Sequence, residues 1–66
     1  MTDIGSRIRF YRESRRLSQA ALARRLGMAS PQLCRYETGH TRPGLLVLGR
    51  IARALNVPLS DFLLGR

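Results

Sequence analysis

Arginine is the most abundant side chain in this sequence that can form strong polar contacts with a partner. Twelve residues are arginine, no lysine occurs and only four residues are acidic, so the formal net charge is +8 at pH 7. A guanidinium group directs two parallel N–H donors at a phosphate or at the edge of a guanine. A basic excess of this size is typical of a surface that binds a polyanion, and nucleic acid is the first partner that we expect.

Residues suited to catalysis or metal binding are scarce. The chain has one cysteine, Cys34, and one histidine, His40. A single cysteine forms no disulfide within the chain, and these two residues do not make up the ligand set of a zinc site. We therefore expect neither an enzyme nor a metal, cofactor or small-molecule ligand. Cys34 is interpreted as a passive small residue in preference to a redox-sensing thiol.

The length and hydropathy of the chain predict one small domain, residues 1–66. The chain is much shorter than the ~150 residues of an average domain, and its hydrophobic content of 44% is sufficient for a packed core. No apolar run reaches the ~18 residues of a membrane span, and the first residues lack the layout of a signal peptide. We expect a cytoplasmic protein that does not associate with membranes.

Apolar residues recur three or four positions apart in five segments, which predicts an all-α fold. The expected helices cover residues 4–16, 18–26, 30–38, 45–55 and 59–63. The residues expected to face the core in the last three helices are Leu33, Tyr36, Glu37, Leu45, Leu48, Ile51, Ala52, Leu55, Leu59, Phe62 and Leu63.

Residues that begin and end helices stand at the expected boundaries. The predicted N-caps are Thr2 or Asp3, Ser18 and Ser30. Pro31 then takes the first position of the third helix, where its missing N–H has no consequence. Gly27 and Gly39 are expected to end the second and third helices in the left-handed conformation. These two helices, separated by a short turn, predict a helix-turn-helix over about residues 18–38, whose second helix enters the major groove of DNA.

Several short motifs occur in a fixed order along nearly the whole chain. They are Leu17-Ser18-Gln19, Leu22-Ala23, Leu26-Gly27, Arg35-Tyr36-Glu37-Thr38-Gly39, Arg42-Pro43 and Ile51-Ala52. In this order and at these separations they resemble the lambda-repressor-like, Cro and xenobiotic-response-element (XRE) family of helix-turn-helix transcriptional regulators. The resemblance implies five helices, a homodimer on a two-fold symmetric operator in double-stranded DNA, and no cofactor. Pro31 departs from the family, in which a polar residue is common at this place.

The resemblance implies DNA-contacting roles for individual residues. Those expected to read bases are Ser30, Pro31, Gln32 and Arg35. Those expected to contact the DNA backbone are Ser18, Gln19, Thr38, His40 and Arg42. Arg35 suits a guanine or, alternatively, a phosphate, whereas Gln32 suits an adenine and Pro31 a thymine methyl group. Gln19 is also expected to steady the first residues of the third helix.

The resemblance further implies an ion pair between Arg12 in the first helix and Glu37 near the end of the third. Such a pair fixes the angle of the recognition helix more than it adds stability. The remaining nitrogens of Arg12 are expected to be free for a phosphate. A solvated face that attracts DNA over a distance is predicted for Arg15, Arg16, Arg24, Arg25, Arg50 and Arg53.

Several apolar residues in the carboxy-terminal half are not expected to be buried in the core, and they predict a dimer interface there. At 100° per residue, Leu46 lies nearly opposite the centre of the buried stripe of its helix, and Val47 lies at the margin. Leu64 lies off the stripe of the last helix. Phe10, on the first helix, is also not expected to be buried in the core, and it suits a contact other than the dimer interface.

Other classes of function remain open on the sequence alone. An antitoxin-type module would mask a toxin and bind its own operator only secondarily. A general RNA binder has the necessary charge, but the aromatic residues form no exposed cluster for base stacking. A membrane-surface peptide is disfavoured because the arginines are spread over several helices. Sequence-specific DNA binding is the leading prediction.

Overall fold

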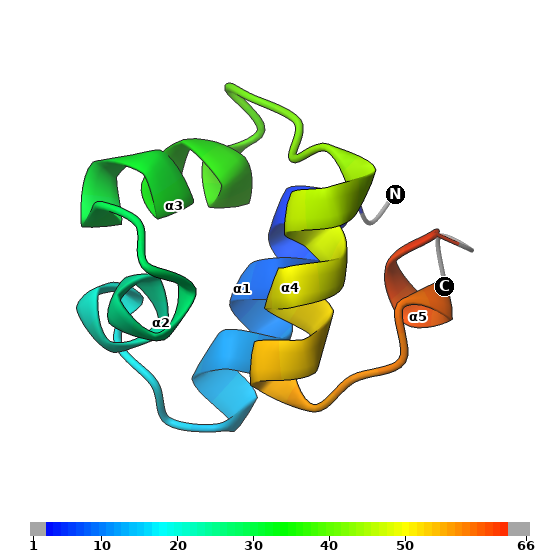
Figure 1. Cartoon of the computed structure of the whole chain (residues 1–66), viewed down its shortest axis with the longest axis horizontal. Coiled ribbons are helices and arrows are strands. Elements are labelled where there is room, and N and C mark those ends of the chain that lie inside the picture. Colours follow the sequence, from blue (N-terminus) through cyan, green and yellow to red (C-terminus); the bar gives the residue numbers. More distant parts are fainter. Residues whose placement is uncertain (1–2, 64–66) are drawn as a thin grey trace.

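In the computed structural model, which describes residues 3–63, the chain folds into five helices, and no strand occurs in that range (Figure 1). They are α1 (Ile4–Ser14), α2 (Gln19–Leu26), α3 (Ser30–Thr38), α4 (Leu45–Leu55) and α5 (Ser60–Leu63). Helices α1 and α4 lie side by side in the middle, with α2 and α3 on one side and α5 on the other. The predicted all-α architecture is confirmed. Among these helices, none is long and apolar enough to cross a membrane.

Helix α1 begins at the predicted cap and ends two residues earlier than expected. The Asp3 carboxylate accepts the N–H of Ser6 at 2.7 Å, and this bond holds the pKa of Asp3 below its usual 3.8 because it favours the charged form. At the other end Arg16 adopts a left-handed φ of 57°, and the N–H of Leu17 donates to the carbonyl of Arg12. This pattern closes the helix in the manner usually supplied by a glycine.

The caps of α2 agree with the prediction, whereas the start of α3 does not. Ser18 Oγ accepts the N–H of Ala21 at 3.0 Å, and Gly27 ends α2 with a φ of 69°. The predicted cap of α3, Ser30, is wrong: Ala29 is the N-cap, and no side chain caps the helix. The carbonyl of Ala29 already accepts the N–H groups of the first turn, so Ser30 lies inside the helix. Pro31 still falls in the first turn, where no N–H is required.

The core fills the space between all five helices. Its buried members are Ile8, Leu22, Ala23, Leu26, Leu33, Tyr36, Leu48, Ile51, Ala52, Leu55, Val57 and Phe62. Two residues expected in the core are exposed: Leu45 by 65% and Leu63 by 52%. Each stands at one end of its helix, and both line a surface groove beside Ile4. The rows of apolar residues on α4 and α5 therefore extend beyond the part of each helix that neighbouring helices cover.

Gly5 allows α1 to touch the backbone of α3. A Cβ atom at this position would lie 2.4 Å from the carbonyl oxygen of Tyr36 and 2.6 Å from that of Glu37. Real Cβ atoms do not approach backbone oxygens so closely, so a side chain here requires the helices to separate. Gly5 thus sets how closely the last turn of α3 packs on α1.

Two arginines predicted to lie on a solvated face instead close the ends of helices. Arg15 Nε donates to the carbonyl of Leu55 in the last turn of α4, and Arg50 Nη2 donates to the carbonyl of Leu26 at 2.6 Å. The last carbonyls of a helix have no partner within the helix, and a cation also suits the negative end of the helix dipole. Both arginines therefore tie one helix to another.

Candidate nucleic-acid interface

Helices α2 and α3 form a helix-turn-helix in which the turn begins at Gly27. Helix α3 buries Leu33, Tyr36 and Glu37 against the rest of the domain. Its opposite side carries Pro31 and Arg35, both exposed. The predicted motif, residues 18–38, corresponds to the two helices and their caps. The arrangement leaves one complete side of α3 open along its length.

The four residues predicted to read bases lie together on the first half of α3. Pro31 and Arg35 are exposed, and Ser30 and Gln32 are half-buried. Within residues 3–63, none of these side chains forms a hydrogen bond to another part of the protein. Their polar groups are therefore available to an external partner, and their contacts with bases stay a prediction.

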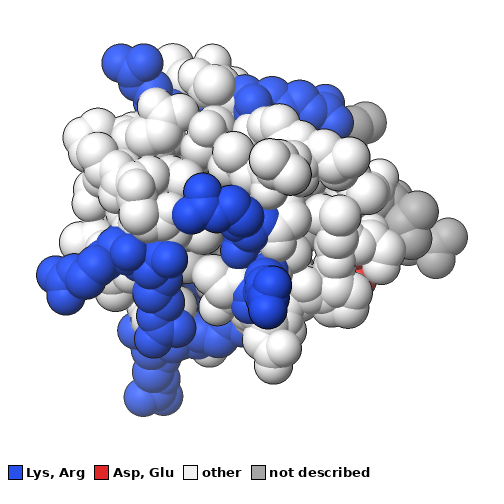
Figure 2. Space-filling view, in the orientation of Figure 1, with Lys and Arg blue, Asp and Glu red and all other residues white. Residues whose placement is uncertain are grey.

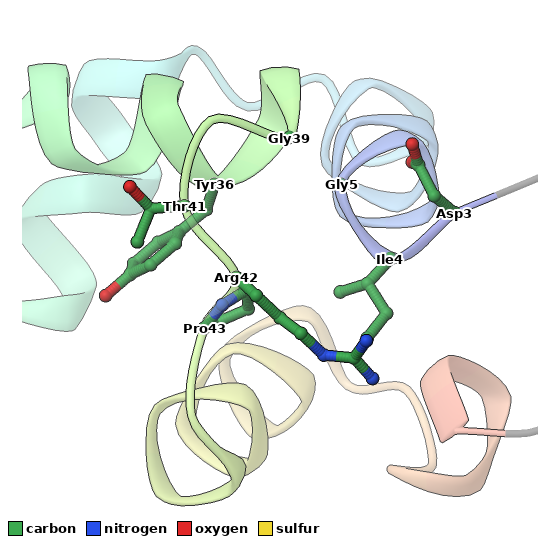
Figure 3. Close-up of a pocket in the computed structure, with 8 residues that line it drawn as sticks. All are labelled: Asp3, Ile4, Gly5, Tyr36, Gly39, Thr41, Arg42 and Pro43. Atoms are coloured by element: carbon green, nitrogen blue, oxygen red, sulfur yellow. The ribbon is translucent and has the colours of Figure 1, made fainter.

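The residues predicted to contact the DNA backbone lie at both ends of the motif. Ser18 caps α2, and Thr38, at the end of α3, places its Oγ1 2.9 Å from the carbonyl of Cys34 and 2.8 Å from His40 Nδ1. His40 and Arg42 lie exposed in the loop that follows. Figure 3 shows Arg42 extended past Pro43 toward the start of α1, beside a small pocket lined by Asp3, Ile4, Gly5, Tyr36, Gly39, Thr41, Arg42 and Pro43. His40 and Arg42 thus lie in the loop after α3, whereas Ser18 lies at the start of α2.

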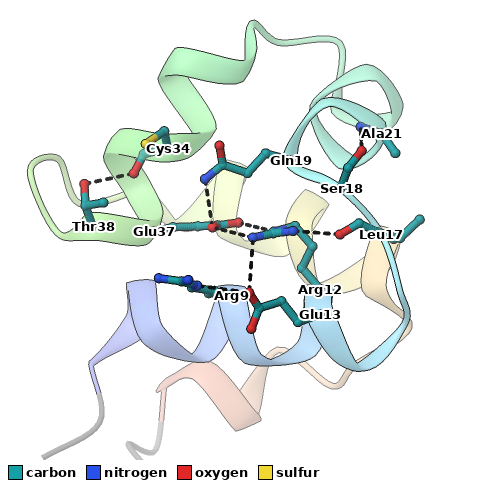
Figure 4. Close-up of polar contacts among 10 residues, drawn as sticks. All are labelled: Arg9, Arg12, Glu13, Leu17, Ser18, Gln19, Ala21, Cys34, Glu37 and Thr38. Atoms are coloured by element: carbon teal, nitrogen blue, oxygen red, sulfur yellow. Dashed lines mark hydrogen bonds and ion pairs between the residues drawn. The ribbon is translucent and has the colours of Figure 1, made fainter.

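A buried ion pair joins α1 to the last turn of α3 (Figure 4). Arg12 Nε donates to Glu37 Oε2 at 2.7 Å, and Arg12 Nη2 donates to Glu37 Oε1 at 3.1 Å. The hydrogen bond to Glu37 raises the pKa of Arg12 above its usual value. The third nitrogen, Nη1, donates to the carbonyl of Leu17 at 2.7 Å. All three nitrogens are engaged and the residue is buried, so the expected phosphate contact of Arg12 is contradicted.

Gln19 completes this cluster, which sequence reasoning missed. Its Nε2 donates to Glu37 Oε1 at 3.0 Å, so one carboxylate is shared by α1, α2 and α3. The prediction that Gln19 steadies the first residues of α3 is wrong, because it holds the last turn instead. A usable signal was present: a buried carboxylate accepts up to about four hydrogen bonds, and Arg12 alone does not supply them. We call Arg12, Gln19 and Glu37 the three-helix clamp.

The acidic side chains are all occupied within the protein. Asp3 caps α1, Glu13 pairs with Arg9 at 3.1 Å, Glu37 belongs to the three-helix clamp and Asp61 accepts the Tyr11 hydroxyl at 3.0 Å. Most of the described arginines are exposed. Figure 2 shows one face crossed by arginine side chains, with acidic surface confined to a small area at its edge. The surface potential of the domain is therefore positive, which favours a polyanionic partner.

Comparisons with known proteins agree with this geometry. A helix-turn-helix family model matches residues 8–62. An HTH-type transcriptional regulator of Sinorhizobium medicae (strain WSM419) is 42% identical over 59 residues, which are 89% of this chain and 42% of that protein. A transcriptional regulator in the ATPase CF(0) region of Rhodospirillum rubrum is 41% identical over 59 residues, 89% of this chain and 55% of that protein. The chain thus spans less than two thirds of the length of these relatives.

A solved structure is also similar. The master regulator for biofilm formation SinR, crystallised in complex with DNA, matches with a TM-score of 0.84 and 30% identity, covering 91% of this chain and 97% of that one. The fold, the helix-turn-helix and the family match over residues 8–62 agree with one another. The chain belongs to the XRE-type helix-turn-helix family of DNA-binding transcriptional regulators.

Proposed function

We propose that this protein is a sequence-specific DNA-binding transcriptional regulator that binds a two-fold symmetric operator as a homodimer. The observation that carries the proposal is the first half of the open side of α3, where the side chains of Ser30, Gln32 and Arg35 have no internal hydrogen bonds while the helix itself is held by the three-helix clamp. The similar SinR structure was solved with DNA, which supports the same use of this fold. The protein acts in the cytoplasm, without catalysis or a cofactor, and nothing in residues 3–63 favours the toxin-masking alternative.

In this proposal, α3 lies in the major groove and two sets of residues contact the DNA. Arg35 donates two hydrogen bonds to a guanine, Gln32 pairs with an adenine, and Ser30 and Pro31 contact neighbouring base edges. The backbone contacts come from Ser18, Gln19, Thr38, His40 and Arg42. The free N–H groups at the start of α2 add donors for a phosphate.

Selection of bound sequences from a random pool of duplex DNA tests this function. An inverted repeat is expected, with half-site centres about 34 Å or one helical turn apart, because two recognition helices must reach the same face of the DNA. Recovery of sequences with no shared motif would contradict sequence-specific binding. Recovery of a single unrepeated motif would contradict the two-fold symmetric operator but not sequence-specific binding.

Arg35→Ala is expected to relax base preference at one position in each half-site. The loss of a bidentate contact to guanine weakens discrimination at that position by about 1–3 kcal/mol, whereas preferences elsewhere are retained. Binding to the selected operator and to its single-base variants provides the measurement. Arg9→Ala, which removes an exposed arginine of α1, is the matched control for charge. Equal weakening on every sequence would assign Arg35 to a phosphate.

We propose that the homodimer forms through the apolar patch at the start of α4. Leu46 is 85% exposed and stands next to the exposed Leu45, with Leu63 across the neighbouring groove. Val47 is half-buried against the core, so only the exposed part of its side chain is available to the dimer interface. Leu64, also predicted in the interface, lies outside the described residues. Figure 1 shows that α3 begins at the far left of the domain and that α4 begins to its right, beyond the loop that follows α3, so a contact at the start of α4 is compatible with a dimer on one face of DNA.

Leu46→Glu is expected to abolish the dimer and weaken operator binding. A carboxylate at this position loses its hydration at the interface without gaining a partner, and two copies repel each other across the two-fold axis. Sedimentation of the variant and the parent, with operator binding in parallel, provides the measurement. Phe10→Glu is the control because Phe10 is exposed on α1. A variant that dimerises like the parent would exclude Leu46 from the interface.

A further inference from the structure

The outer side of α4 carries a shallow groove that the proposed DNA contacts do not use. One part is lined by Leu45, Leu46, Gly49, Arg50 and Arg53. The same two arginines line an adjoining part together with Arg25, Leu26 and Ala54. The two parts share Arg50 and Arg53, and together we call them the α2–α4 groove. None of the residues predicted to contact DNA lines it.

Gly49 makes the floor of the α2–α4 groove. It lies in the middle of α4, where glycine is less favourable than alanine because it leaves the unfolded chain more freedom. A Cβ atom at Gly49 would meet nothing within 4 Å. Packing within the domain therefore does not require glycine here, in contrast to Gly5. The missing side chain instead lets an external group approach the backbone of α4 between Leu46 and Arg53.

The rim of the groove is strongly basic. Arg25, Arg50 and Arg53 are exposed, and none of the described residues that line the groove is acidic. Arg50 is held in place by its hydrogen bond to the carbonyl of Leu26, so part of the rim is already ordered. Figure 2 shows arginine side chains beside uncharged surface on the face that α4 presents. The groove thus combines an apolar floor with fixed positive charge.

We propose that the α2–α4 groove binds an acidic amphipathic helix of a partner protein. Apolar side chains of that helix pack on Gly49 beside Leu46 and the methylene groups of Arg53, and its carboxylates pair with the three arginines. This mode leaves the open side of α3 free for DNA. The proposal does not depend on DNA binding, because the groove shares no residue with the base-reading set. Its Leu45 and Leu46 end overlaps the proposed dimer interface, so the partner helix and a second copy of the chain compete for these two residues.

The other occupants fit the groove less well. A second copy of the chain seated along the whole groove, beyond the Leu45 and Leu46 end that the proposed dimer uses, would bring the Arg50 and Arg53 side chains of both copies together, and the acidic residues of the chain are engaged elsewhere. Nucleic acid would satisfy the arginines but would leave the apolar floor without a complementary surface. An acidic amphipathic helix matches both the charge and the apolar floor.

Titration of the uniformly 15N-labelled protein with a synthetic peptide tests the proposal. The peptide is about 16 residues long, with leucines on one helical face and glutamates on the other, and a scrambled peptide of equal charge serves as comparison. Saturable shifts are expected at the amides of Gly49, Arg50 and Arg53 with the amphipathic peptide only. Gly49→Leu, which fills the floor, and Arg53→Gln are each expected to raise the Kd about tenfold. Arg9→Gln, a matched loss of charge on α1, is expected to change the Kd less than about twofold.

Five outcomes would overturn the proposal. Shifts confined to residues 30–35 would mean that the peptide imitates DNA at α3. Equal effects of Arg53→Gln and Arg9→Gln, or equal binding of the scrambled peptide, would reduce the interaction to net charge. A random-sequence duplex that shifts the Gly49 and Arg53 amides would assign the groove to nucleic acid. A change in sedimentation of Gly49→Leu without the peptide would assign it to a second copy of the chain.

Discussion

Replacing Glu37 with alanine is expected to lower the free energy of unfolding by about 3–5 kcal/mol. The substitution removes the acceptor of two Arg12 hydrogen bonds and one Gln19 hydrogen bond. Arg12 then remains buried with only the exposed carboxylate of Glu13, 3.9 Å from Nη2, to compensate its charge, which is far more unfavourable than the absence of the whole pair. Urea denaturation followed by circular dichroism measures the change.

Two comparison variants separate the loss of the three-helix clamp from other effects. Arg12→Met combined with Glu37→Leu is expected to recover much of the stability, because neither charge remains buried. Glu13→Ala removes an exposed carboxylate of α1 that pairs with Arg9 at 3.1 Å and lies 3.9 Å from Arg12 Nη2, and because this carboxylate is solvated its effect is expected to stay within about 1 kcal/mol. If Arg12→Met and Glu37→Ala had small and additive effects, the pair would behave as a surface contact and the clamp would be refuted.

Gly5→Ala is expected to destabilise the protein by about 3 kcal/mol, the upper end of the usual range for overpacking. The atoms in the way are the carbonyl oxygens of Tyr36 and Glu37, which belong to the backbone and have no alternative rotamer. Helix α1 must move away from α3, and this movement also stretches the bonds from Arg12 to Glu37. The midpoint of urea unfolding and the affinity for the selected operator are both expected to fall.

Gly49→Ala is the matched control, because it makes the same chemical change in another helix. Its Cβ meets nothing within 4 Å, so the gain in helix propensity is not offset by a clash. A stabilisation of about 0.5–1 kcal/mol is expected. If the two variants unfolded at the same urea concentration, the close approach of α1 and α3 would not be what requires glycine at position 5.

The features that the sequence predicted well are those that depend on neighbouring residues. Ser18 bonds to a backbone N–H three residues away, and Gly27 and Gly39 end their helices through their own backbone conformation. The five helices follow from the spacing of apolar residues in the same way. The ion pair of Arg12 and Glu37 was anticipated only through the family resemblance, because the two residues lie 25 positions apart.

Apart from the N-cap of α3 and the end of α1, which are local, the features that were missed depend on partners distant in the chain. Arg15 bonds to Leu55, 40 positions away, and Arg50 bonds to Leu26, 24 positions away. Composition does not distinguish an arginine that closes a distant helix from one that only contacts water. Leu45 has the correct phase to be buried, but periodicity does not reveal which end of a stripe a neighbouring helix leaves uncovered. Such facts require the tertiary arrangement.

The three-helix clamp has a consequence for how this protein can diverge. The side chains that hold α3 in place, Glu37 with Arg12 and Gln19, are distinct from Pro31 and Arg35 on its open side, whose side chains have no internal hydrogen bonds. Substitution at Pro31 or Arg35 therefore removes no intramolecular hydrogen bond of the described domain. Under the proposed function, mutational drift on the open side is expected to alter the preferred operator while stability changes little, as is usual for surface positions. Under the proposed function, duplicated copies of the gene are expected to acquire new operators while each intermediate sequence keeps a stable fold.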